Sequence, residues 1–201
     1  MSASVWKWLL SLAIVPLYVF AEQQNAGDSP SGNIHFELRK TSDEGAKEIW
    51  LSEKDKKSAA VKLCDTPGWG NLEIHFSPDD YWLIVQDGGA SLGVSLRLFK
   101  RDKGVVFKEI ENADINGKAE RLALQQNGLP PKEVLDHLYV QCLAWSSDSK
   151  TVLVRISGHG GTPNFGVVIG GWQGIYDLGS SSFNFDLAKM NRGAVEKQPK
   201  Q

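Results

Sequence analysis

The sequence predicts a mainly β protein built from antiparallel repeats, with one short helical insertion. Two stretches carry the same pattern of an aromatic residue, a Ser-x-Asp turn and three aliphatic residues. Phe76 corresponds to Trp145, Ser77 to Ser146, Asp79 to Asp148, and residues 83–85 to 152–154. Short runs of Val, Ile, Leu, Trp and Phe alternate with Gly, Asp, Asn and Ser turns, which is typical of strands. Repeated units of this kind bury their apolar faces against one another.

The better-defined copy spans residues 72–111. Pro78 favours a tight turn because its ring fixes φ, and the neighbouring aspartates can accept hydrogen bonds from backbone amides. The second strand is apolar on both faces, which places it inside the sheet. The predicted strands cover residues 72–76, 81–87, 94–100 and 105–111.

A second copy spans residues 139–187 and a shorter one lies near the start of the chain. The second copy predicts strands over 139–145, 151–157, 172–178 and 183–187. In the short copy, residues 48–60 align with 95–107, and 33–39 form the preceding strand. The predicted single domain covers residues 34–187.

Residues 112–138 interrupt the repeats. A helix is predicted over Lys118–Asn127, with its small and apolar side chains on one face. Gly128 suits the position after a helix end, and Pro130 would stop the helix. Pro131 can begin a second short helix ending near Leu138. The insertion is either a docking element or a lid over an edge strand.

The repeats resemble WD40-like β-propeller repeats, with the exported TolB type as the nearest variant. The shared features are a first strand ending in aromatic-Ser-x-Asp, an apolar second strand, and a third strand followed by an Asp- or Gly-bearing turn. The resemblance implies four-stranded antiparallel blades whose loops bind a protein or a small ligand. Complete propellers have at least about four blades, whereas this chain offers two full copies and one partial copy. We therefore expect an open stack or a ring completed by a second chain; a β-sandwich is the alternative.

The first 21 residues have the composition of a signal peptide. Lys7 precedes an apolar run from Leu9 to Phe20, and small side chains at Val19 and Ala21 suit cleavage before Glu22. The run would span about 18 Å as a helix, too short for a bilayer core of about 30 Å. We expect an exported protein, periplasmic or extracellular, with no membrane insertion after cleavage. Polar segments at 22–33 and 188–201 predict a disordered leader and tail.

Composition limits the classes of partner. The formal net charge is −2, with both signs interspersed, whereas a nucleic-acid surface needs a basic stripe. No cysteine or histidine has a second ligand at metal-binding spacing, so neither a metal nor a cofactor is expected. In an oxidising compartment Cys64 and Cys142 either form a disulfide or are two separately buried thiols.

Residues 89–93 match the G-x-S-x-G nucleophile elbow around Ser91, and His159-Gly160-Gly161 resembles an oxyanion-hole segment. Nucleophile elbows join a strand to a helix, whereas a strand is predicted after Ser91. The oxyanion segment also follows the elbow here, in the reverse of the usual order. No catalytic residue is therefore predicted.

Two tryptophans lie among glycines, Trp69 and Trp172. Each is either an exposed contact residue, typical of interface hot spots, or packs across a glycine-lined strand. The predicted binding residues are these two tryptophans with His159 and Asn164, and the predicted surface also includes the loops 88–94 and 157–171. The leading hypothesis is an exported, non-enzymatic binding module that acts on a protein partner or self-associates. The alternatives are a small serine hydrolase using Ser91 and an inhibitor or immunity-type protein.

Overall fold

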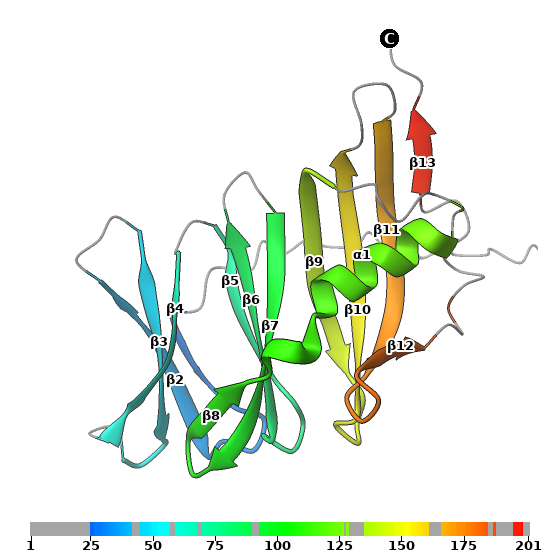
Figure 1. The fold of residues 1–201 in the computed structure, drawn as a ribbon. Helices are drawn as coiled ribbons and strands as arrows, with labels where there is room; N and C mark the ends of the chain where they lie inside the picture. The colour runs from blue at the N-terminus through cyan, green and yellow to red at the C-terminus, as the bar shows by residue number, and fades with distance from the viewer. Residues whose placement is uncertain are drawn as a thin grey trace, which may run out of the picture.

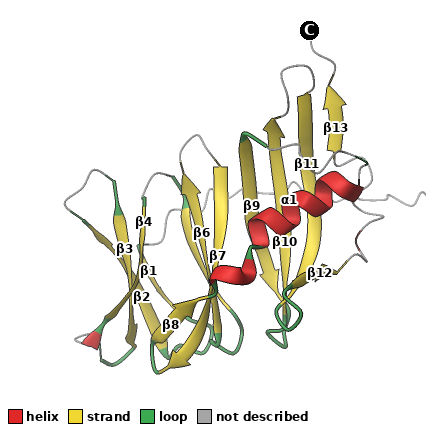
Figure 2. Ribbon diagram, in the orientation of Figure 1, coloured by secondary structure: helices red, strands yellow, loops and turns green. Residues whose placement is uncertain are grey.

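A computed structural model shows three four-stranded antiparallel meanders, placed one after another, and one helix (Figures 1 and 2). A short parallel pairing of residues 93–94 with 138–139 joins the second and third meanders into one continuous sheet. The model describes residues 25–41, 45–56, 59–67, 70–89, 93–126, 128, 135–160, 166–184, 187 and 195–198. We call the three meanders blades 1, 2 and 3. Among the described residues no helix is long and apolar enough to cross a membrane.

Blade 1 contains the first four strands, each paired with the next along the chain. They are β1 (Ala26–Asp28), β2 (Ile34–Lys40), β3 (Lys47–Glu53) and β4 (Val61–Thr66). The sequence predicts only a partial first copy, preceded by a disordered leader over 22–33. The structure corrects this prediction, because β1 lies within that leader and completes the sheet.

Blades 2 and 3 repeat the same meander. Blade 2 contains β5 (Leu72–Phe76), β6 (Trp82–Gly89), β7 (Gly93–Lys103) and β8 (Val106–Glu109). Blade 3 contains β9 (His137–Trp145), β10 (Thr151–Gly160), β11 (Gly166–Asp177) and β12 (Ser182–Asn184). The final strand, β13 (Val195–Gln198), pairs with β11 and falls within the predicted disordered tail, which is a second correction.

The same turn joins the first and second strands of every blade. A serine begins it, and the serine N–H donates to the carbonyl five residues later: Ser29 to Ile34 at 2.8 Å, Ser77 to Trp82 at 2.9 Å, and Ser146 to Thr151 at 2.9 Å. The fourth residue has positive φ: Gly32 (72°), Asp80 (57°) and Ser149 (58°). The third residue, Asp79 or Asp148, accepts a hydrogen bond from the serine hydroxyl. The aspartates thus have the turn role that the repeat predicts.

Two separate hydrophobic cores lie between the blades. One lies between blades 1 and 2 and includes Phe36, Leu51 and Phe99. The other lies between blades 2 and 3 and includes Ile84, Val154 and α1. Three blades with two cores between them confirm the prediction of propeller-like antiparallel repeats, whereas a sandwich has one core between two facing layers.

The helix α1 (Ile115–Gln126) follows a 3₁₀ turn (Glu111–Ala113) and packs on the core between blades 2 and 3. Its Asn116 side chain accepts a hydrogen bond from the Leu96 N–H at 2.9 Å and donates one to the Leu96 carbonyl at 3.0 Å. On the side of β7 away from β6, Leu96 lies between the stretch that pairs with β9 (residues 93–94) and the stretch that pairs with β8 (residues 99–103). Because Asn116 bonds the backbone of β7 in this gap, α1 acts as the predicted lid over a strand edge. Gly128 has the expected positive φ of 68°. The second predicted helix lies partly outside the described residues, and its expected end is instead the beginning of β9.

The two cysteines are free thiols buried in different cores. Cys64 lies in the core between blades 1 and 2, and Cys142 in the core between blades 2 and 3. Burial raises the pKa of the Cys64 thiol to about 11 and that of the Cys142 thiol to about 12. The sheet of blade 2 lies between the two cores, so of the two alternatives left open by the sequence the structure shows two separately buried thiols.

Candidate functional site

Of the predicted binding residues, Trp172 belongs to the core. Its side chain is only 1% exposed, and its indole N–H donates to the Gln126 side chain on α1 at 2.9 Å. The ring packs edge-on against Phe183, and a Cβ added at Gly174 would come within 2.4 Å of it. The glycines around Trp172 therefore make room for a buried ring rather than presenting an exposed one.

His159 is exposed and lies on β10, where it pairs across the sheet with His137. The two imidazole rings lie 4.5 Å apart, centroid to centroid. The sequence did not suggest this pair, because it placed His137 on a helix. Among the described residues there is no group of three His, Cys, Asp or Glu side chains suited to a metal ion.

Trp69, Asn164 and Ser91 lie outside the described residues, so their predicted roles stay predictions. The segment after Ser91 is described, and it forms β7 from Gly93 onward. A nucleophile elbow needs a helix at that point. This observation does not favour the hydrolase alternative.

A cavity of about 340 Å³ lies where the three blades and α1 meet. Its lining includes Pro67 from the end of blade 1, Asp87 from β6, Asn116 from α1 and Leu138 from β9. The Asp87 carboxylate is only 8% exposed, and no described residue donates a hydrogen bond to it. Burial raises the pKa of Asp87, and the Arg97 guanidinium opposes that rise.

Asp87→Asn is expected to stabilise the protein at neutral pH. A carboxyl whose pKa is higher in the folded than in the unfolded state binds protons more readily when folded. The stability that it contributes is present below its unfolded pKa and is lost as the pH rises through its folded pKa. At pH 7 we therefore expect the variant to have a higher free energy of unfolding than the wild type.

Urea denaturation at a series of pH values tests this prediction. The gain of the variant over the wild type should shrink as the pH falls from neutral through the raised pKa of Asp87, and it should be gone at the ordinary carboxyl pKa. Equal stability of the two proteins at neutral pH would contradict a desolvated Asp87. Asp79→Asn, in an exposed turn position one strand earlier, serves as a control that should show no such gain.

The faces of the blades follow a strict alternation along the second strands. One face of β6 packs on blade 1 through Leu83 and Val85, and the equivalent residues of β10, Val152 and Val154, pack on blade 2. The opposite faces of blades 1 and 2 pack on the blade that follows each of them. The central cross-strand pairs of this face are Phe36–Leu51 in blade 1, Ile84–Leu98 in blade 2 and Leu153–Ile175 in blade 3. In the part of the chain that the structure describes, no blade lies before blade 1 and none lies after blade 3.

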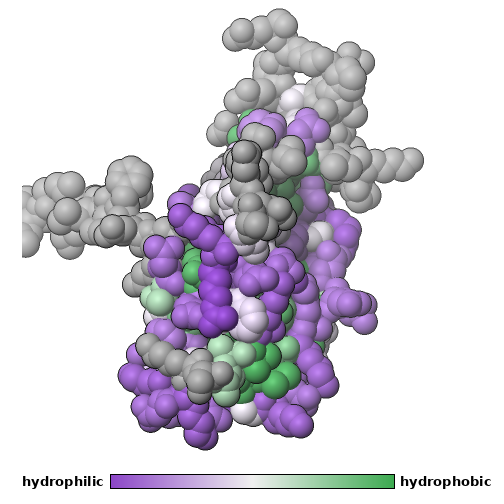
Figure 3. All heavy atoms as spheres, turned by 90° about the vertical axis from the view of Figure 1, so that its left-hand side faces the viewer, coloured by the Kyte–Doolittle hydropathy of each residue, from purple (hydrophilic) through white to green (hydrophobic). Residues whose placement is uncertain are grey.

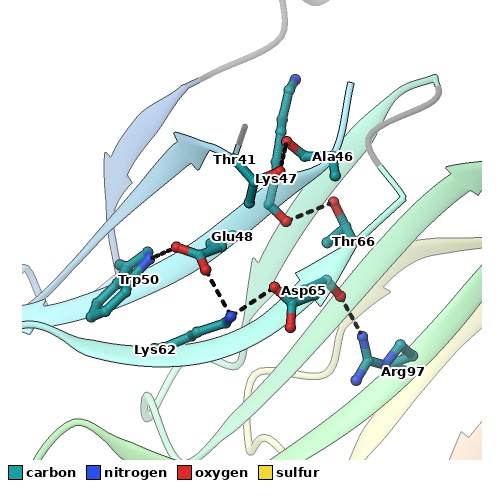
Figure 4. Close-up of polar contacts among 9 residues, drawn as sticks. All are labelled: Thr41, Ala46, Lys47, Glu48, Trp50, Lys62, Asp65, Thr66 and Arg97. Atoms are coloured by element: carbon teal, nitrogen blue, oxygen red, sulfur yellow. Dashed lines mark hydrogen bonds and ion pairs between the residues drawn. The ribbon is translucent and has the colours of Figure 1, made fainter. Parts of the chain in front are cut away.

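The outer face of blade 1 is polar and internally paired. Figure 3 views this end of the molecule, where hydrophilic residues predominate and hydrophobic ones form smaller areas among them. Figure 4 shows the Glu48 carboxylate between Trp50 and Lys62: the indole donates to it at 2.8 Å and the ammonium at 2.7 Å. Lys62 also reaches Asp65 at 2.7 Å, and the Arg39 guanidinium lies 4.2 Å from the centroid of the Trp50 ring. Hydrogen bonds from Lys62 and then Trp50 lower the pKa of Glu48. The charged and polar side chains on the outer face of blade 1 are thus paired with one another, as on a solvent-exposed surface.

The outer face of blade 3 has a different composition. Leu153 and Ile175, which correspond to buried pairs in the other two blades, are only partly buried here and belong to neither core. Beside them Leu143 is 45% exposed. Leu143 is the extra residue of a β-bulge in β9, since Leu153 pairs with Ala144 and Val154 with Cys142. Arg155 and Gln173 add polar groups to this face. We call it the open face.

The turns of neighbouring blades are also hydrogen-bonded to one another. In blade 2 the Asp80 carboxylate, 1% exposed, accepts hydrogen bonds from the Ser29 hydroxyl at 2.7 Å and from the Ser31 hydroxyl and N–H. In blade 3 the Ser149 hydroxyl accepts one from the Asp79 N–H at 3.2 Å. Both acceptors occupy the fourth turn position, and each binds the turn of the preceding blade. We call this contact the turn clamp.

No protein-family model and no curated protein matches the chain. Among solved structures it is similar to the β-propeller domain of the Trilobed protease from Pyrococcus furiosus, described as an open velcro topology. The identity is 11% and the TM-score 0.37, over 81% of this chain and 57% of that one. It is also similar to a prolyl endopeptidase, with 8% identity and a TM-score of 0.39 over 89% of this chain and 28% of that one. The chain thus spans less than two thirds of the length of both.

Proposed function

We propose that the chain is a non-enzymatic interaction module whose open face binds a protein. The observation that carries the proposal is the Leu153–Ile175 pair. Its counterparts in blades 1 and 2 are buried against the next blade, whereas this pair has no described sheet over it. A face that combines such an apolar centre with Arg155 and Gln173 around it resembles the apolar core and polar rim of a protein interface.

The opposite end of the chain supports the same choice of face. The outer face of blade 1 has polar His35 and Glu37 at the positions where blades 2 and 3 have aliphatic residues. The His35 ring is bonded to Asp28 at 2.8 Å, and Glu37 is paired with Arg39. An end finished in this way offers little apolar area to a partner, so binding is assigned to blade 3.

The proposal also includes export of the protein and a likeness to TolB-type repeats. Export rests on the first 21 residues, which have the order of charge, apolar run and small residues found in signal peptides. The likeness to TolB-type repeats rests on the Ser-x-Asp turn of blades 2 and 3, while blade 1 has Ser-Pro-Ser at the same place. Both features support an interaction in the periplasm or outside the cell.

Site-specific photo-crosslinking tests the proposal in cells that produce the protein. A photoreactive amino acid is placed at Leu153 on the open face and, as the matched control, at Glu37. Glu37 lies on a second strand too, but on the outer face of blade 1. We expect a defined protein adduct from position 153 and none from position 37. Absence of an adduct at 153, or equal labelling at both positions, would sink the proposal.

A further inference from the structure

The open face of blade 3 is one half of a blade–blade interface whose other half no described residue supplies. We infer that its occupant is an antiparallel β-blade of a different polypeptide, with an acidic or hydroxyl side chain at the fourth position of its turn. This inference rests on the proposed function, because it specifies the class of protein that the open face binds. The chain contains two blade–blade interfaces, and both show what a third one would need.

Both interfaces are built from the same apolar parts. On one side lies the cross-strand pair of the earlier blade, Phe36–Leu51 or Ile84–Leu98. On the other side lie aliphatic residues of the later blade, such as Val85 or Val154, at the equivalent place in the second strand. Leu153 and Ile175 present the first half of this arrangement again. The second half must therefore come from a further sheet with aliphatic residues at those positions.

In the turn clamp the earlier blade always supplies the donor and the later blade the acceptor. In both interfaces the N–H of the third turn residue donates to the side chain of the later blade: Ser31 to Asp80, and Asp79 to Ser149. The equivalent donor of blade 3 is the N–H of Asp148, and no described residue accepts from it. The next blade in the series would have to supply an oxygen acceptor, as Asp80 and Ser149 do.

Blade 1 of a second copy of this chain cannot supply this oxygen acceptor. The fourth turn residue of blade 1 is Gly32, which has no side chain to accept a hydrogen bond. The residues that would face the Leu153–Ile175 pair are His35 and Glu37, already bonded within blade 1. Two open faces paired with each other would both present the earlier-blade half of the interface, Leu153 and Ile175, and neither would supply the later-blade half. The geometry thus points to a blade from another protein.

Substitutions in blade 1 of the full-length chain can test this inference, because they can give blade 1 the residues expected of the missing partner blade. The triple variant Gly32→Asp, His35→Leu, Glu37→Val gives blade 1 the residues that blade 2 has at the same positions, Asp80, Leu83 and Val85. Aspartate suits the new position, since Gly32 and Asp80 have φ of 72° and 57°. We expect a monomeric wild type and a triple variant that associates head to tail into dimers or longer chains, measured by sedimentation velocity.

Two controls separate the intended contact from non-specific aggregation. Adding Leu153→Asp to the triple variant should restore the monomer, because it removes the centre of the open face. Restoring Gly32 while keeping the other two changes should weaken association by about tenfold, because it removes a hydrogen bond to a charged acceptor.

Three results would overturn the inference. One is a triple variant that is folded by circular dichroism but stays monomeric, and another is association that Leu153→Asp leaves unchanged. The third is a wild type that already dimerises and loses the dimer on Leu153→Asp, which would make a second copy the occupant. Any of these, together with a specific crosslink at position 153, would still leave the proposed function standing.

Discussion

Replacing Trp172 with alanine is expected to lower the free energy of unfolding by about 3–5 kcal/mol. The indole is almost completely buried between β11, Phe183 and α1, and its removal leaves a cavity that the glycines around it cannot fill. It also removes the donor that bonds Gln126 and holds α1 against blade 3. Urea denaturation followed by far-ultraviolet circular dichroism measures the loss without depending on tryptophan fluorescence.

Trp50→Ala is the matched control, because it removes the same side chain from the outer face of blade 1. The Trp50 ring is partly buried and touches mainly the charged groups around it. A loss of about 1 kcal/mol is expected there. Similar losses for the two variants would contradict a core role for Trp172 and reopen its predicted role at a binding surface.

Asp80→Gly is expected to destabilise the chain by about 2–3 kcal/mol, because it breaks the turn clamp between blades 1 and 2. Glycine accepts the positive φ at this position at no steric cost, as Gly32 does in blade 1. The effect therefore reports the lost carboxylate. Ser29 is buried and would lose the acceptor of its hydroxyl, which makes the loss larger than that of an exposed hydrogen bond.

Ser149→Gly makes the same change in the turn of blade 3, where a neutral hydroxyl accepts a single N–H. A smaller loss of about 1 kcal/mol is expected. Urea denaturation of both variants measures the difference. If Asp80→Gly were no more harmful than Ser149→Gly, the clamp between blades 1 and 2 would have no special weight and the directional argument for the open face would weaken.

The alternation of apolar and polar residues predicted most of the strands of blades 2 and 3. It missed β1, because three residues of Ala, Gly and Asp carry no apolar signal and form a strand only by pairing with β2. The turn at Ser29-Pro30-Ser31-Gly32 could have shown the complete first copy, since it has the same serine and the same glycine-compatible fourth position as the other two. Aligning the turns rather than the strands would have found it.

The candidate site was harder to predict. Trp172 was proposed as a contact because glycines flank it, but the sequence does not show that Phe183 and α1 close over the ring. His137 and His159 are 22 positions apart and meet only through the register of β9 and β10. The open face is recognised by comparing blades, since no described sheet covers the Leu153–Ile175 pair. Leu153 reads as a core residue in the sequence because the same position is buried in both other blades.

The position of blade 2 between two cores has a consequence for how the molecule comes apart. Each outer blade shares one interface, whereas the middle one shares both, as in a short linear chain of coupled units. Opening at either end costs one interface and leaves the other intact, while opening in the middle costs both. Hydrogen exchange at β6 should therefore report global unfolding, and exchange at β2 or β10 can report events confined to one end. Blade 2 is therefore the unit that couples the unfolding of the two outer blades.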